Sequence, residues 1–318
     1  MNLRGAVILA ACFTALGLAT AAAFAPYLFV EYSVLTDRHA IIVPGPAKIA
    51  RGRMVDDYWS VEKIAPDTWA IGEPRYYQQN YSYLILGRDR AVMMDAGTGT
   101  RDIRPVLKNL TALPITVIPS HLHFDHTGGL GAFDHIAFLD EGDLRARTKD
   151  GLFRPSRYEF LGAGDHLPDP VWRISEWWKP DSIVDLGGRK LQVFATPGHT
   201  PNGLSLWDAQ NRMLFTGDYI YPTTIYAFLP GASLSAYRQT ARRLLATMPS
   251  DTRLWTAHCC RAGEDAAAPW LSMADVQDLA AALDRLDRGE GKGAGFYPVR
   301  RPVDAQMTLA TGWPFNNR

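Results

Sequence analysis

Four side chains able to bind a metal crowd into residues 121–126, and this cluster limits what the chain can fold into. The segment reads Ser-His-Leu-His-Phe-Asp-His-Thr-Gly-Gly and follows a short run of β-forming residues. His121 and His123 therefore point to the same side, whereas Asp125 and His126 enter a glycine-rich turn. Burying three imidazoles and a carboxylate without a metal or polar partners is costly. Zinc prefers these ligand types, so the cluster predicts a metal site.

Three more candidate ligands stand singly downstream, each at the end of a predicted strand: His199, Asp218 and His258. Strand ends that meet at one edge of a layered sheet are where α/β folds place their sites. With the cluster these residues make seven donors, which is enough for two metals.

The composition is that of an ordinary globular protein and excludes two classes. Lys+Arg and Asp+Glu each number 33, and 47% of the residues are hydrophobic. A disordered chain would be less hydrophobic and carry a charge excess. A neutral chain also lacks the basic field of a nucleic-acid binder, so we expect no nucleic-acid partner. Cys12, Cys259 and Cys260 exclude a disulfide framework, and we expect Cys259 and Cys260 to pack as thiols.

An uncharged run of 26 residues, Gly5 to Val30, precedes the rest of the chain. As a helix it is long enough to cross a ~30 Å hydrocarbon layer. The run predicts a membrane anchor over residues 1–30, with a cleaved signal peptide ending at Ala21–Ala23 and a buried core helix as alternatives. Arg4 favours an inside N-terminus. We therefore expect a cell-envelope protein whose body faces outside the plasma membrane, anchored to it or secreted or periplasmic.

The pattern of the remaining chain predicts a connector over residues 31–55, a globular domain over 56–290 and a C-terminal tail over 291–318. Hydrophobic patterning favours helices over residues 102–110, 234–248 and 273–286. Short runs bounded by Gly, Pro and Asp favour strands over residues 59–64, 68–71, 81–86, 91–95, 115–119, 182–185, 190–195, 204–207, 213–216 and 253–257. Two clusters of strands, each followed by helices, indicate a layered α/β sandwich.

The ligand pattern resembles the metallo-β-lactamase superfamily, whose signature is His-x-His-x-Asp-His followed by single His, Asp and His. The resemblance covers residues 56–290 and implies a four-layer αββα sandwich. It implies that His121, His123 and His199 hold one zinc, that Asp125, His126 and His258 hold the other, and that Asp218 bridges both. Zinc, manganese and iron all tolerate such ligands. By position, Asp95 would support a ligand histidine; its alternative is a turn residue before Gly97.

The resemblance implies a hydrolase in which a metal-bridging hydroxide attacks a carbonyl. Two Zn²⁺ with Asp125, Asp218 and a hydroxide leave one positive charge, which suits an anionic intermediate. Asp125 is also a candidate to carry the proton. Asp218 disfavours β-lactam hydrolysis, because β-lactamases lack that bridging carboxylate. The pattern is similar to the glyoxalase II, lactonase and thioesterase branches, and implies an ester, lactone or thioester substrate.

Residues 196–206 and 214–221 further resemble the thioesterase-type members known as metallo-β-lactamase domain-containing protein 2, although Ala257 stands where glycine is usual. Aromatic residues after the ligands favour a small, acyl-bearing substrate, with packing of these rings as the alternative. Tyr221 and Tyr226 are both candidates to donate to a carbonyl oxygen. The other functions left open are phosphoester hydrolysis and a non-catalytic metal-binding role in the envelope.

Overall fold

The two predicted clusters of strands form two six-stranded sheets. The computed structural model describes residues 3–36, 40–260 and 264–313, with side chains from residue 20 onward. The first sheet has the order β1 (Arg53–Met54), β2 (Ser60–Ala65), β3 (Thr68–Gly72), β4 (Tyr81–Leu86), β5 (Ala91–Met94) and β6 (Ile115–Ile118). The second has the order β11 (Ile183–Asp185), β12 (Lys190–Ala195), β13 (Leu204–Asp208), β14 (Met213–Gly217), β16 (Arg253–Thr256) and β17 (Trp270–Ser272).

Apolar side chains fill the space between the two sheets. Tyr83 and Ile85 of β4 meet Leu206 of β13 and Phe215 of β14 there, and all four are buried. Residues 81–85 of β4 and all of β14 are buried along their whole length, which requires cover on both faces of each sheet. Hence each sheet needs an outer layer as well as the shared core.

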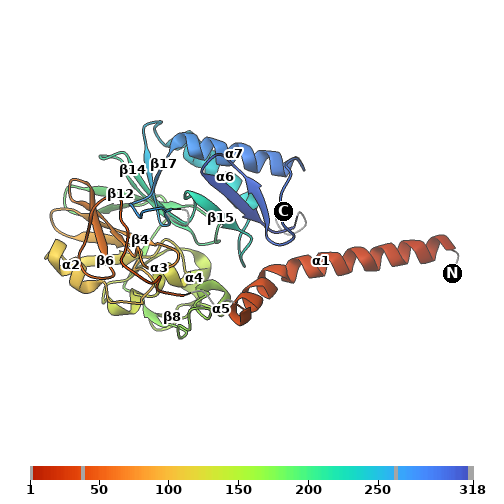
Figure 1. The fold of residues 1–318 in the computed structure, drawn as a ribbon, viewed down its shortest axis with the longest axis horizontal. Coiled ribbons are helices and arrows are strands. Elements are labelled where there is room, and N and C mark those ends of the chain that lie inside the picture. Colours follow the sequence, from red (N-terminus) through yellow and green to blue (C-terminus); the bar gives the residue numbers. More distant parts are fainter. Residues whose placement is uncertain (1–2, 37–39, 261–263, 314–318) are drawn as a thin grey trace.

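Helices supply the outer layers (Figure 1). On the second sheet, α6 (Leu234–Thr247) and α7 (Met273–Asp287) pack their apolar faces together and against the strands. The Ser233 hydroxyl accepts a hydrogen bond from the amide of Ala236 and so begins α6. On the first sheet, α2 (Arg104–Leu110) buries Val106 and Leu107. The layers run helix, sheet, sheet, helix, as predicted.

The segment between the clusters carries small elements. They are α3 (Phe124–Thr127), a 3₁₀ turn (Leu130–Ala132), β7 (Ala137–Leu139), α4 (Gly142–Arg147), β8 (Leu152–Phe153), α5 (Arg157–Phe160), β9 (Trp172–Arg173) and β10 (Glu176–Trp178). The aromatic rings of Phe153, Phe160 and Trp172 are buried in the core of the first sheet. These three rings therefore pack the core, which is the predicted alternative to lining a substrate site.

Within the predicted tail over residues 291–318, residues 299–302 and 307–311 form two strands. Here β18 (Val299–Pro302) and β19 (Met307–Thr311) form a three-stranded sheet with β15 (Thr223–Ala227). Leu309 and Met307 of β19 are buried beside α6 and α7. The strand β19 pairs in parallel with β15, a contact that local sequence does not show.

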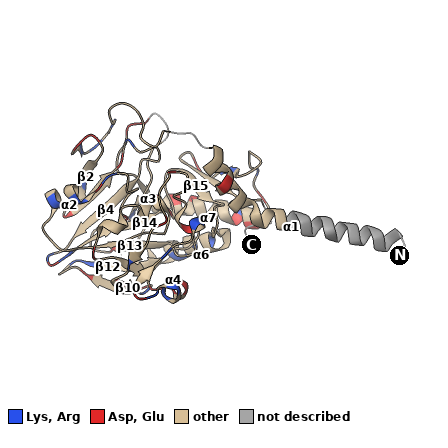
Figure 2. Ribbon diagram, turned by 90° about the horizontal axis from the view of Figure 1, so that it is seen from below, with Lys and Arg blue, Asp and Glu red and all other residues tan. Residues whose placement is uncertain are grey.

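The helix α1 (Leu3–Thr36) extends six residues past the predicted end of the apolar run, into the predicted connector. Its C-terminal end reaches the body beside α5 (Figure 1). Among the residues that the structure describes, no helix is long and apolar enough to cross a membrane. The side chains of residues 1–19 lie outside that part, so the anchor over residues 1–30 stays a prediction. Acidic and basic residues are interspersed over the body (Figure 2).

Candidate metal centre

The seven predicted ligands converge at one edge of the sandwich. His121 follows β6, and Asp218 and His258 follow the parallel neighbours β14 and β16. His199 follows β12, which runs in the same direction as β14 because both pair antiparallel with β13. The chain needs glycine at Gly217, where a Cβ would lie 2.3 Å from that of Ser120. Strand direction and this close approach together bring the ligand loops into contact.

His121, His123 and His199 form the first set. All three are buried, and their candidate ligand atoms lie within 4.8 Å of one another. Nδ1 of His123 lies 2.9 Å from Nε2 of His121 and 3.0 Å from Nε2 of His199. Ligand nitrogens at zinc distances of ~2.0–2.1 Å in a tetrahedron would lie about 3.3 Å apart. The spacing therefore suits three nitrogens around one small ion.

Asp125, His126, Asp218 and His258 form the second set, also buried. Nε2 of His126 lies 3.3 Å from a carboxylate oxygen of Asp125 and 3.3 Å from one of Asp218. Nε2 of His258 lies 3.1 Å from Oδ2 of Asp218. The same Asp218 oxygen lies 3.6 Å from Nε2 of His199 in the first set. Asp218 thus stands between the two sets, where the resemblance placed a bridging ligand.

Several buried polar atoms of this centre have no hydrogen-bond partner within the described chain. Two of them, Nε2 of His126 and Oδ1 of Asp218, face each other in the second set at 3.3 Å. An orphaned buried polar atom costs about 1–3 kcal/mol, so a native site normally satisfies it. A cation held by the second set would satisfy both atoms. The residues therefore fit a dinuclear metal centre.

The pKa values of the histidines also differ between the two sets of donors. Burial lowers the pKa of His123 to about 3 and holds that of His121 well below its ordinary value, so both rings stay neutral with free lone pairs. In the second set burial opposes charge on His258, but Asp218 and Asp125 outweigh it and raise its pKa to about 10. The two carboxylates of the second set therefore favour a positive charge beside them, which a divalent cation supplies.

The carboxylate of Asp95 accepts hydrogen bonds from the candidate ligand His126 and from Ser120. Its Oδ2 accepts a hydrogen bond from Nδ1 of His126 at 2.8 Å, and its Oδ1 accepts from the amide of Ser120 at 2.6 Å. The hydroxyl of Ser120 also donates to Oδ2 at 3.0 Å. This arrangement leaves Nε2 of His126 facing the centre. The predicted support of a ligand histidine is the role that the contacts of Asp95 fit.

Backbone carbonyls orient the two remaining single histidines. Nδ1 of His199 donates to the carbonyl of Tyr226 at 2.6 Å, and Nδ1 of His258 donates to that of Gln78 at 3.3 Å. Asn80 donates from its amide to the carboxylate of Asp125 at 3.1 Å. Sequence reasoning missed Gln78 and Asn80, because a polar loop between two strands carries no metal-site motif.

A cavity of about 580 Å³ opens over the metal centre. His123, Asp125, His199, Asp218 and His258 lie in its wall. The other lining groups include the apolar Phe29, Val30, Val34, Phe124, Leu161 and Leu229, the phenols Tyr221 and Tyr226, and Arg300. A volume of this size suits a small molecule. Sequence reasoning found the two phenols but missed Arg300, which lies in the predicted tail.

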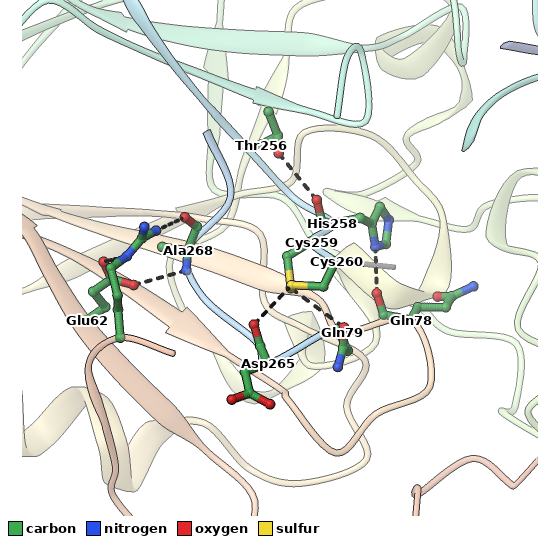
Figure 3. Close-up of a disulfide and its surroundings, with 10 residues drawn as sticks. Glu62, Gln78, Gln79, Thr256, His258, Cys259, Cys260, Asp265 and Ala268 are labelled. Atoms are coloured by element: carbon green, nitrogen blue, oxygen red, sulfur yellow. Dashed lines mark hydrogen bonds and ion pairs between the residues drawn. A yellow bond between two sulfur atoms is a disulfide. The ribbon is translucent and has the colours of Figure 1, made fainter. Parts of the chain in front are cut away.

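The expectation that Cys259 and Cys260 pack as thiols is wrong in this structure, because they form a disulfide directly after His258 (Figure 3). The sulfur of Cys259 also contacts the side-chain carbonyl of Gln79 at 3.6 Å. The bond joins neighbouring residues, so it links no distant segments and makes no disulfide framework. Both cysteines line the cavity.

Comparisons with known proteins agree with this site. The family model described as "Metallo-beta-lactamase superfamily" matches residues 75–258, more than half of the chain. Acyl-coenzyme A thioesterase MBLAC2 of Bos taurus is 26% identical over 212 residues, covering 59% of this chain and 76% of that protein. Hydroxyacylglutathione hydrolase of Albidiferax ferrireducens is 28% identical over 188 residues, covering 57% of this chain and 63% of that protein.

A solved metallo-beta-lactamase from Pontibacter korlensis covers 71% of this chain and 99% of its own, with a TM-score of 0.53. Its sequence is 18% identical to this one, so the likeness concerns the fold alone.

Proposed function

This chain belongs to the metallo-beta-lactamase superfamily and is a metal-dependent hydrolase, and we propose that it is a dinuclear zinc enzyme cleaving an ester, lactone or thioester bond. The observation that carries the proposal is the double set of seven buried donors under a cavity with apolar walls. His121, His123 and His199 would hold one ion, and Asp125, His126 and His258 the other, with Asp218 between them. When bound, the two ions supply a hydroxide at neutral pH and polarise the scissile carbonyl.

The chain's own residues orient the reaction. Asp95 and the carbonyls of Tyr226 and Gln78 fix the ligand histidines, so that each turns its other nitrogen to the centre. We further propose that Asp125 takes up a proton and returns it to the leaving group, because a ligand carboxylate has a second oxygen for this task. Asn80, which donates to Asp125, would hold that carboxylate in place.

Of the two candidate phenols, the contacts favour Tyr221 as donor to the substrate carbonyl. Its hydroxyl accepts a hydrogen bond from the amide of Tyr226 at 3.2 Å, and its ring packs on His258 with centroids 5.1 Å apart. Burial raises the pKa of Tyr221, so the hydroxyl keeps its proton at neutral pH and stays a donor. Tyr226 is 40% exposed and contributes its backbone to both His199 and Tyr221.

The cavity favours a substrate with one apolar part and few charges. Arg300 is the single Lys or Arg among the described residues that line it. A phosphoester with several anionic oxygens would call for more positive side chains near the metals. The names of both relatives describe hydrolysis of thioesters, which agrees with an acyl-bearing small molecule.

We also propose that the domain works in the cell envelope, attached to the membrane or released by cleavage. The uncharged run over residues 5–30 supports this location. The Cys259–Cys260 disulfide supports it independently, because disulfides persist in oxidising compartments outside the cytosol. The mass of the N-terminal peptide from isolated membranes tests whether the run is cleaved.

The experiment that tests the activity uses the full-length chain loaded with zinc. Matched acyl thioester, acyl-homoserine lactone, β-lactam and phosphodiester substrates are compared by kcat/KM, with His123→Ala as the inactive control. Turnover of a carbonyl substrate that His123→Ala abolishes supports the proposal. Turnover of the phosphodiester alone would replace it with phosphoester hydrolysis. Two metals per chain without turnover of any substrate would favour a non-catalytic role.

A further inference from the structure

Helix α1 enters the wall of the cavity over the metal centre. Phe29, Val30, Ser33 and Val34 line that cavity together with the candidate ligands His123 and Asp218. The predicted role of α1, as anchor or signal, does not account for this position. An element that contacts the same cavity as the ligands is placed to contact substrate as well.

Specific contacts hold this end of α1 on the body. Glu31 forms an ion pair with Arg157 at 2.8 Å and accepts a hydrogen bond from the hydroxyl of Tyr158 at 3.1 Å. The ring of Phe29 packs edge-on against Phe228 with centroids 4.9 Å apart. The helix is therefore fixed against both the α5 region and the segment that follows β15, and the cavity lies between these supports.

A second cavity, of about 140 Å³, follows the same face of α1. Ala23, Pro26 and Tyr27 line it on the helix side, and Phe228 and Leu229 line it on the body side. Leu229 lines the first cavity too. The contact between Phe29, from the first cavity, and Phe228, from the second, marks the boundary between them.

The helix positions that line the two cavities form one stripe. They are residues 23, 26, 27, 29, 30, 33 and 34, whose spacing is that of one helix face. The opposite face carries exposed side chains, among them Leu28 at 63% and Leu35 at 72%. From residue 34 to residue 23 the stripe is about 16 Å long, the length of an extended chain of roughly 13 bonds.

We propose that the stripe on α1 and the facing residues Phe228 and Leu229 form a groove for the apolar acyl chain of the substrate. The proposal rests on the proposed hydrolase function and adds where the chain lies. The scissile carbonyl would sit over the metals, and the acyl chain would run along α1 towards Ala23. The helix is then a specificity-determining element of the active site, and removing it would remove one wall of the site.

The test compares chain lengths in the full-length protein. The measured quantity is the ratio of kcat/KM for a dodecanoyl thioester to that for a butanoyl thioester. Burial gains about fourfold for each methylene taken from water. We expect the wild type to favour the longer chain. Ser33→Trp fills the groove and should lower the ratio at least tenfold, whereas Phe29→Ala opens the boundary to the second cavity and should raise it.

Leu35→Trp is the matched control, because it adds the same side chain to the exposed face two residues away. A ratio in Ser33→Trp that stays within twofold of the control would overturn the groove. A wild type that hydrolyses no acyl substrate would instead refute the proposed function.

A binding experiment tests the groove separately from the proposed hydrolase function. A fluorescent twelve-carbon fatty acid is titrated into inactive His123→Ala protein, alone and combined with Ser33→Trp or Leu35→Trp. The groove predicts at least tenfold weaker binding with Ser33→Trp and no change with Leu35→Trp, whatever reaction the enzyme catalyses. Equal binding by all three proteins, or binding by none, contradicts it.

Discussion

Replacing Asp95 with asparagine isolates the part that one carboxylate plays in the metal centre. Asp95 lies at φ 66°, in the left-handed region, which asparagine tolerates far better than most residues, so the backbone should not change. The carboxylate accepts from Nδ1 of His126 on one oxygen and from the amide of Ser120 on the other. The side-chain oxygen of asparagine can accept one of these two hydrogen bonds. Its NH₂ group is a donor and cannot accept the other.

The expected magnitude follows from that lost bond. A hydrogen bond to a charged group is worth about 1.5–3 kcal/mol, and ~1.4 kcal/mol corresponds to a tenfold change. Asp95→Asn should therefore weaken metal binding at the His126 site by about 10- to 150-fold. With His126 no longer held at Nδ1, its Nε2 loses its fixed direction towards the centre.

The assay is competition for zinc between the metal-free protein and a chromophoric chelator. Asp67→Asn is the matched control, because Asp67 is exposed and also has a positive φ, of 52°. Circular dichroism checks that both variants fold. Zinc affinity of Asp95→Asn within threefold of the wild type would refute the argument that Asp95 positions a ligand.

The remaining predictions concern the substrate donor, a buried acid and a buried ion pair. Tyr221→Phe should lower kcat about 10- to 100-fold by removing a donor to the developing oxyanion, while Tyr226→Phe changes it little; steady-state kinetics showing equal effects would exclude Tyr221 as the specific donor. Burial raises the pKa of Glu73 from 4.5 to about 7, so the native state holds more protons than the unfolded state between these values. The free energy of unfolding should then fall by about 3 kcal/mol as pH rises through that window, and urea titrations of metal-free Glu73→Gln should lack this decline; an unchanged slope would contradict it. Arg189 donates to the buried Asp208 at 2.8 Å and to the backbone of the first sheet. Arg189→Met leaves Asp208 uncompensated and should lower the free energy of unfolding by about 3–5 kcal/mol in urea, and a loss under 1 kcal/mol would show that the pair does not join the sheets.

Local pattern sufficed for the elements with strong periodicity. The predicted strands 81–86 and 190–195 coincide with β4 and β12, and the helix predicted over 234–248 ends within one residue of α6. Their run of β-forming residues or their amphipathic face is visible within a single segment. The candidate ligands of residues 121–126 were equally readable, because three imidazoles and a carboxylate in six residues have few other uses.

Features that depend on contacts between distant segments were missed. Arg300 lies in β18, whose sequence Val-Arg-Arg-Pro shows no apolar alternation, and its strand exists through pairing with β19. Phe29 belongs to a run whose hydrophobicity indicates a membrane as readily as a cavity wall. Asn80 reaches Asp125 across 45 residues of sequence. In each case the role of the residue depends on its contact with a distant segment of the chain, which the local sequence does not show.

The central claim, that two sets of buried donors hold two metals for hydrolysis, is tested most directly by titration. Metal-free full-length protein is titrated with zinc while hydrolysis of an acyl thioester is measured, and bound metal is counted in the same samples. The account predicts that activity rises to a plateau at two zinc ions per chain and that Asp218→Ala reaches no such plateau. Full activity at zero or one bound ion, or in Asp218→Ala, would contradict it.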